Sequence, residues 1–345
     1  MLVGESATLQ IHPTLRCNLR CKHCYSASGP DITKELPIEL LTNAISQAAD
    51  MGYTKLAVSG GEPFLYRRLP DLLCAARDCG MLNLVTTNAL LVGGRAFNPS
   101  IPYIDFLAVS LDGQPSSHNQ IRCSTTAFQR MQRNLPRLEE ISVPFGFIFT
   151  LTRFNAHEIE WVAAFSHERG ARALQIHPLT ESGRASVSMV GNAPDGLELL
   201  AALSEGARLS SLYPDLQIHV DAVDRAQLLG FREWFVPRVD DEISLLVPTL
   251  IVDAEGTVRP LTYDIAPRFH FGSLRNQDME TLRADWDVRV RDRFWELIDL
   301  THRDLTRDES LLATYWYNEV AARSLQIGTT KTTRENVVIR GREEA

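Results

Sequence analysis

Short apolar segments rich in β-branched residues alternate with amphipathic helical stretches through the first half of the chain, and this alternation restricts the possible folds. We expect strands at 7–12, 54–59, 82–87, 104–110, 143–151 and 172–177, with helices near 37–51, 68–80, 125–140 and 156–169. Strands that alternate with helices predict βαβ units and a parallel sheet. Six such units predict an α/β fold, a partial (β/α)6 TIM-like barrel with its chemistry at the carboxyl ends of the strands.

The pattern changes after residue 185. Residues 186–196 contain Ser, Gly and Pro and predict a connecting segment. Helices follow, together with strands that include a pair around the turn at 253–256. We therefore expect a core barrel over 1–190, a smaller α+β C-terminal region over 191–325, and a disordered tail over 326–345, which is polar and has little to bury.

Composition excludes several classes of function. The 345 residues carry a net charge of −8, and no basic stripe stands out, so we expect no nucleic-acid partner. No apolar run approaches the roughly 20 residues that span a bilayer, so we expect no membrane association. Without a targeting pattern, the chain is expected to be cytoplasmic, with its thiols reduced.

Three cysteines, Cys17, Cys21 and Cys24, stand in a CxxxCxxC run directly after the first expected strand. Three soft thiolates at this spacing favour an iron–sulfur cluster, and three ligands leave one coordination position free for a reacting molecule. The run leaves two alternatives open, a Cys3His zinc site that uses His23 and a set of inert buried cysteines.

Polar clusters follow the other strands and should meet at the same rim of the barrel. Each cluster comes directly after an expected strand, at the end where barrel enzymes place their chemistry. These clusters are Gly60-Gly61-Glu62-Pro63 after the second strand, Thr87-Asn88 after the third, Ser110-Leu111-Asp112-Gly113 after the fourth and His177-Pro178-Leu179 after the sixth.

With these motifs in this order, residues 7–185 resemble the radical S-adenosylmethionine (SAM) enzymes. The segment from Ser110 to Gly113, followed by His118 and Arg122, is similar to the peptide-modifying branch that often carries a SPASM or twitch domain. The resemblance implies one [4Fe–4S] cluster on Cys17, Cys21 and Cys24, with SAM bound at the free iron.

The resemblance also implies a role for each polar cluster. Gly60, Gly61, Glu62 and Pro63 would receive the methionine amino group of SAM, and Ser110 and Arg122 its carboxylate. Tyr25 would lie beside the adenine, Thr87 and Asn88 near the ribose, and the segment from His177 to Leu179 near the adenosine. Arginine suits a carboxylate because it can donate two parallel hydrogen bonds.

The C-terminal half departs from these relatives. Its hairpin places Leu261 where a cysteine ordinarily binds an auxiliary cluster, and no cysteine follows Cys123, so we expect a single cluster. Cys123 itself follows Arg122, where the relatives tend to have glycine, and its thiol is a candidate hydrogen donor to a substrate radical. Tyr263 and Asp264 in the hairpin are candidates for facing the substrate.

The leading hypothesis is a radical SAM enzyme that cross-links or epimerises a ribosomally made peptide, as a maturase. Two alternatives are a small-molecule radical SAM enzyme, acting on a tetrapyrrole side chain or a sugar, and a non-catalytic metal-bearing binding protein. The expected partners are a flavodoxin or ferredoxin electron donor and a separate protein that binds the leader peptide.

Overall fold

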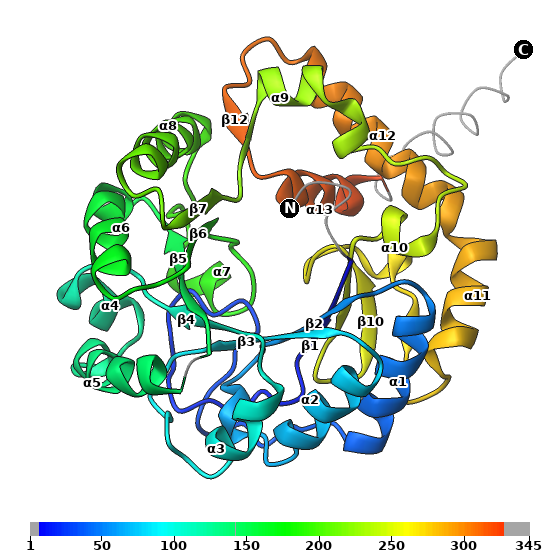
Figure 1. Ribbon diagram of the computed structural model, residues 1–345. Helices are drawn as coiled ribbons and strands as arrows, with labels where there is room; N and C mark the ends of the chain where they lie inside the picture. The colour runs from blue at the N-terminus through cyan, green and yellow to red at the C-terminus, as the bar shows by residue number, and fades with distance from the viewer. Residues whose placement is uncertain (1–6, 142, 328–345) are drawn as a thin grey trace, which may run out of the picture.

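The computed structural model describes residues 7–141 and 143–327. In this part of the chain, ten strands form one sheet that curves around a central space (Figure 1). The order across the sheet is β11 (Gly272–Ser273), β10 (Thr257–Pro260), β9 (Thr249–Val252), β1 (Thr8–Ile11), β2 (Lys55–Val58), β3 (Leu82–Thr87), β4 (Phe106–Ser110), β5 (Phe145–Leu151), β6 (Ala173–Pro178) and β7 (Gln217–Val220).

Strands β1 to β7 are parallel neighbours in chain order, which confirms the expected partial barrel. Alternate side chains along each strand point to opposite faces of the sheet. In β1, Leu9 and Ile11 are fully buried in the core, whereas Gln10 lines the central cavity. In β4, Ala108 and Ser110 line the same cavity. One face of the sheet therefore builds the core and the other builds the site.

Helices cover the outer face of the strands (Figure 1). In α1 the residues Ile38, Leu41, Ile45 and Ala48 are buried, a helical spacing that turns one apolar stripe towards the sheet. The helices are α1 (Ile38–Asp50), α2 (Leu69–Asp78), α3 (Phe97–Ser100), α4 (Pro115–Ile121), α5 (Ala127–Glu140), α6 (Ile159–Glu168), α7 (Ala185–Ser188), α8 (Gly196–Leu212), α9 (Arg225–Gly230), α10 (Ile243–Leu246), α11 (Met279–Arg289), α12 (Arg291–Arg307) and α13 (Trp316–Gln326).

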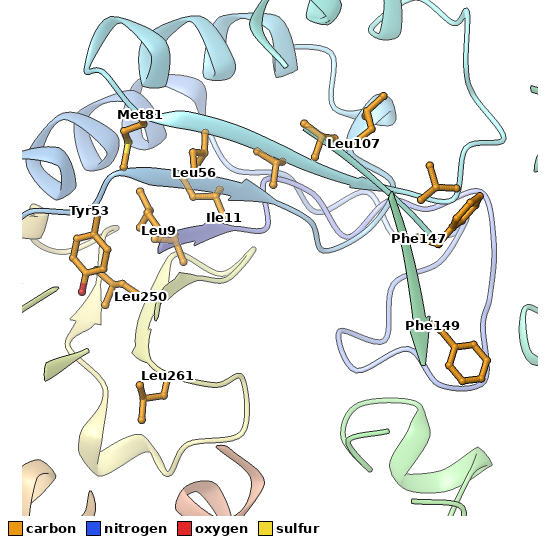
Figure 2. Packing of buried hydrophobic residues seen from close by; sticks show 14 of the residues in the cluster. Leu9, Ile11, Tyr53, Leu56, Met81, Leu107, Phe147, Phe149, Leu250 and Leu261 are labelled. Carbon is orange, nitrogen blue, oxygen red and sulfur yellow. The ribbon is translucent and has the colours of Figure 1, made fainter. Parts of the chain in front are cut away.

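The C-terminal region adds strands to both ends of this sheet. Strand β9 pairs in parallel with β1, and β10 and β11 continue from it in antiparallel order. Figure 2 shows Leu9, Leu56 and Leu250 gathered where β1, β2 and β9 lie side by side. Helices α9, α12 and α13 and a small sheet of β8 (Val223–Asp224) and β12 (Ala313–Thr314) lie between the β7 and β10 sides of the ring (Figure 1).

Two sequence expectations concern the ends and the environment of the chain. Helix α13 runs to Gln326, and residues 328–345 of the expected disordered tail lie outside the described residues. None of the helices among the described residues is long and apolar enough to cross a membrane. The division into regions 1–190 and 191–325 stays a prediction.

Candidate functional site

A cavity of about 890 Å³ occupies the inside of the barrel. Most of the predicted site residues lie in segments that follow separate strands, and most of them meet on the wall of this cavity. Those that line it are Cys17, Cys21, Cys24, Tyr25, Gly60, Gly61, Glu62, Thr87, Asn88, Ser110, Arg122, His177 and Leu179. Pro63, buried at the start of a 3-10 turn, and Cys123, which is exposed, are not among these lining residues.

The cysteine loop is held by a cation that sequence reasoning missed. The Arg184 guanidinium, just past β6, donates hydrogen bonds to the carbonyl oxygens of Cys21 at 2.8 Å, Ala27 at 3.0 Å and Ser28 at 2.7 Å. Its backbone N–H also donates to the carbonyl of Cys24 at 2.9 Å. Arg184 therefore fixes the loop that carries the three thiols. The available sequence signal was a Gly-Arg pair after the sixth strand.

The three thiols suit a cluster better than a single metal ion. Cys17 and Cys24 are half-buried, Cys21 is buried, and all three line one cavity. Among the described residues, no group of three or more Cys, His, Asp or Glu side chains converges on a point that one ion could occupy. In a [4Fe–4S] cluster each thiolate binds a different iron, so convergence on one point is not required. This donor set therefore fits the cluster.

His23 has another partner. Its Nε2 lies 3.0 Å from Oδ2 of Asp112, so the ring is engaged with a carboxylate instead of completing a Cys3His zinc set. Burial raises the pKa of Cys17 to about 11 and that of Cys21 to about 12. Metal binding requires the thiolate form, so bound iron itself must supply the charge that deprotonates these thiols.

The paired glycines approach the cysteine loop. Gly60 has a positive φ of 95°, and a Cβ on Gly61 would overlap the carbonyl of Arg16. The N–H of Gly61 donates to the carbonyl of Thr14 at 2.9 Å, and the N–H of Glu62 donates to that of Arg16 at 2.9 Å. The resemblance implies that these glycines receive the methionine amino group of SAM, and that role stays a prediction. Their close backbone contact is with the segment that leads into Cys17.

Glu62 presents a carboxylate to the cavity from a buried position. It accepts hydrogen bonds from Thr87 Oγ1 at 2.9 Å and from the Asn88 N–H at 3.0 Å. Burial raises the pKa of Glu62 to about 7, although these hydrogen bonds oppose the shift. The Asn88 amide donates to Asn18 Oδ1 at 2.7 Å, which ties this group to the cysteine loop. An ammonium group in the cavity would gain from this carboxylate.

Arg122 is held by a buried carboxylate. Its Nε donates to Asp112 Oδ2 at 2.6 Å, and both side chains are buried. Burial alone would raise the pKa of Asp112, but Arg122 and His23 hold it well below its usual range. Within the described residues, the Arg122 side chain donates through Nε only, which leaves its terminal nitrogens without an acceptor, and Arg122 lines the cavity. Those nitrogens can pair with a ligand carboxylate.

The Tyr25 hydroxyl belongs to a buried polar network. It lies 3.0 Å from His12 Nε2 and 2.9 Å from Ser59 Oγ. The Tyr263 ring stacks on His12 and meets Tyr25 edge-on, with centroids 5.6 and 5.5 Å away. Burial lowers the pKa of His12 to about 3, so the ring is neutral. Tyr263 and Asp264 both line the cavity, so the structure brings these two hairpin residues to the site.

Residues 11–166 match the family model of the radical SAM superfamily. The chain contains a radical SAM domain. This family is characterised by a [4Fe–4S] cluster, and solved structures of the same fold contain bound SAM.

Relatives of the radical SAM domain include proteins named for different substrates. The domain is 30% identical over 176 residues to the Fe-coproporphyrin III synthase of Methanosarcina barkeri (strain Fusaro / DSM 804), covering 50% of this chain and 44% of that one. It is 25% identical over 186 residues to the sporulation killing factor maturation protein SkfB of Bacillus subtilis (strain 168), covering 52% and 44%. The chain thus spans less than half the length of these relatives.

The fold likeness extends beyond the radical SAM domain. The structure of Streptococcus suis SuiB bound to S-adenosylmethionine superimposes with a TM-score of 0.64 at 16% identity, covering 85% of this chain and 68% of that one. SuiB has also been solved with its precursor peptide SuiA. This match shows a shared fold and includes part of the C-terminal region.

The cavity also has an aromatic component. Trp234, Phe235, Tyr315 and Tyr317 supply aromatic rings to its wall. Among the described residues that line the whole cavity, Lys55 and Arg122 are the only lysine and arginine, and Arg122 is already paired with a carboxylate. Acidic groups are present, so the electrostatics disfavour a substrate with several negative charges.

Proposed function

We propose that this chain binds one [4Fe–4S] cluster through Cys17, Cys21 and Cys24 and cleaves SAM reductively to abstract hydrogen from a ribosomally made peptide. The observation that carries the proposal is the common wall on which the cysteine loop, the Glu62 carboxylate and the Arg122 guanidinium face one cavity. When bound, the reduced cluster supplies the electron that breaks the S–C5′ bond of SAM and gives a 5′-deoxyadenosyl radical.

The protein residues bind and orient SAM. Glu62 would accept a hydrogen bond from the methionine ammonium, and the terminal nitrogens of Arg122 and the hydroxyl of Ser110 would bind the carboxylate. Thr87 and Asn88 would hold Glu62 in place through the hydrogen bonds already described. Leu179, buried at the end of β6, would supply an apolar contact to the adenosine.

Charge supports a peptide over a tetrapyrrole. Fe-coproporphyrin carries several propionate groups, which call for arginine or lysine partners. The cavity wall offers aromatic rings and acidic groups instead. A peptide segment can be neutral or cationic and can place an aromatic or aliphatic side chain there. We also propose a flavodoxin or ferredoxin as the electron donor, and a separate protein that binds the leader peptide.

A small-molecule substrate is the second candidate, favoured by the 30% identity to the Fe-coproporphyrin III synthase. The two candidates separate by binding. Fe-coproporphyrin III added to the holoenzyme should leave its Soret band unshifted if the substrate is a peptide. A saturable spectral shift at micromolar concentration would favour the tetrapyrrole.

Anaerobic reconstitution tests the activity. It should give about four irons and four sulfides per chain, and dithionite with SAM should release 5′-deoxyadenosine. Replacing Cys17, Cys21 and Cys24 together by alanine should remove both results. Cys74→Ala, which changes a half-buried cysteine outside the cavity lining, is the matched control and should change neither. Product release by the triple variant would refute the cluster assignment.

A further inference from the structure

A second polar cluster lies in the cavity, centred on a carboxylate at the end of β7. Asp221 Oδ2 lies 2.7 Å from His177 Nδ1 and accepts a hydrogen bond from Gln175 Nε2 at 2.6 Å. Its other oxygen, Oδ1, lies 3.0 Å from His219 Nε2. All four residues line the cavity, and of these four the resemblance to radical SAM enzymes implied a role only for His177, near the adenosine.

The charge state of Asp221 fixes the tautomer of His177. Burial alone would raise the pKa of Asp221, but hydrogen bonds from His177 and His219 hold it well below its usual range. An ionised carboxylate only accepts, so the neutral form of the His177 ring carries its proton on Nδ1. The lone pair of His177 is therefore on Nε2, on a side chain that remains 35% exposed.

Tyrosines complete the surroundings of this histidine. The Tyr315 ring meets His177 edge-on with centroids 5.2 Å apart, and Tyr317 also lines the cavity. Burial raises the pKa of Tyr315 far above its usual value and that of Tyr317 to about 12, so both remain protonated. Of the titratable groups around His177, Asp221 and Tyr315 contact its ring, whereas His219 contacts Asp221 and Tyr317 packs edge-on against Tyr315.

Strand register distinguishes the two histidines. His177 is paired with Thr150, whose N–H points to the Asp112 carboxylate, whereas His219 is paired with Gln175, two residues earlier along β6. His177 is therefore nearer to the carboxyl ends of the strands, where the cysteine loop and Arg122 lie.

We propose that His177, positioned by Asp221, is a catalytic base for the substrate. This rests on the proposed function. Loss of a hydrogen atom from a peptide carbon makes an N–H or O–H on the adjacent atom more acidic. The substrate heteroatom–hydrogen bond breaks, an Nε2–H bond forms, and the resulting imidazolium is stabilised by the Asp221 carboxylate. Only a proton moves in this step, and the unpaired electron stays on the substrate.

The first test needs no substrate. Diethyl pyrocarbonate reacts with the unprotonated ring nitrogen of histidine. Peptide mass spectrometry of the treated holoenzyme measures the modification of His177 separately from that of the other histidines. His177 should react, and the pH midpoint of its reaction should fall by about one unit in Asp221→Asn, which removes the stabilising charge. His219→Gln keeps that charge and should shift the midpoint less. An unreactive His177, or equal midpoints in wild type and Asp221→Asn, would overturn the proposal.

SAM separates this role from an adenosine contact. With SAM bound, His177 should still be modified by diethyl pyrocarbonate. Full protection of His177 by SAM would instead assign it to the cofactor. If the wild type released no 5′-deoxyadenosine, the proposed function would fail, while the modification profile would still report on His177.

Product formation gives the direct readout. For a peptide that the wild type modifies, His177→Gln should lower the product formed per 5′-deoxyadenosine released by about 100-fold or more, and His219→Gln should stay within about threefold of wild type. An equal loss of product in the two glutamine variants would mean that the Asp221 hydrogen bonds only hold β6 against β7.

Discussion

The buried Asp112–Arg122 pair makes a quantitative prediction for Asp112→Asn. Asparagine keeps the shape of the side chain but removes the negative charge 2.6 Å from Arg122 Nε. The Asp112 side chain is fully buried and that of Arg122 is 8% exposed, so the remaining cation would have no carboxylate partner among the described residues. His23 would lose the same charged partner at 3.0 Å.

The burial of the pair sets how much the free energy of unfolding should fall in Asp112→Asn. Breaking a buried ion pair by removing one partner costs about 3–5 kcal/mol. Arg122 faces the cavity, where water can reach its terminal nitrogens, so we expect the lower end, about 3 kcal/mol. For a chain of this length that corresponds to a fall in melting temperature of about 4 °C. Thermal denaturation of the anaerobic protein, followed by circular dichroism, measures it.

A surface pair provides the control. Arg68 and Asp71 are 2.5 Å apart with both side chains more than half exposed, so Asp71→Asn should cost less than about 1 kcal/mol. A second check is Asp112→Asn combined with Arg122→Met, which removes the unpaired cation and should recover part of the loss. If Asp112→Asn cost no more than Asp71→Asn, the pair would not stabilise the site as described.

Three further predictions concern the cysteine loop and its support. Arg184→Met removes three hydrogen bonds to the cysteine loop, so the amount of iron bound per chain after reconstitution should fall by more than half. An unchanged iron content would contradict the role of this arginine. Gly61→Ala places a methyl group against the Arg16 carbonyl and should lower the free energy of unfolding, measured by urea denaturation, by about 1–3 kcal/mol. As the control, Gly230→Ala has open space around its Cβ and should leave this free energy nearly unchanged. Burial lowers the pKa of His12 from 6.5 to about 3, so between these pH values the unfolded chain binds a proton that the folded chain does not. The free energy of unfolding should therefore fall by about 2 kcal/mol as the pH is lowered from 7.5 to 5. His12→Asn should flatten this pH dependence, and an equally steep profile in the variant would refute the assignment.

Local sequence patterns predicted the barrel because each element has its own signal. Strand β5 reads Phe-Gly-Phe-Ile-Phe-Thr-Leu, and α1 carries an apolar stripe, so both could be placed without tertiary information. The cysteine run and the Gly-Gly-Glu-Pro segment are contiguous, so they could be recognised as units. Their proposed roles toward the cluster and SAM stay predictions.

Long-range contacts were beyond sequence reasoning. Arg184 acts on carbonyls more than 150 residues earlier in the chain, and Asp221 joins side chains from two strands. Neither has a local pattern that distinguishes it from a surface charge. Cys123 shows the opposite case, because its place after Arg122 suggested a donor. It is exposed, with a positive φ of 50° and no position in the cavity lining, so we do not propose it as the hydrogen donor.

The pairing of β1 with β9 has a consequence for the timing of assembly. Strand β1, which leads directly into the cysteines, acquires its second neighbour only when the chain has been made as far as Val252. At synthesis rates of roughly 5–20 residues per second, roughly 10–50 seconds pass between synthesis of the three cysteines and synthesis of β9, and during this time one edge of β1 is unpaired. Iron delivered during translation would therefore meet a half-built site, and stable loading belongs to the period after the hairpin has closed.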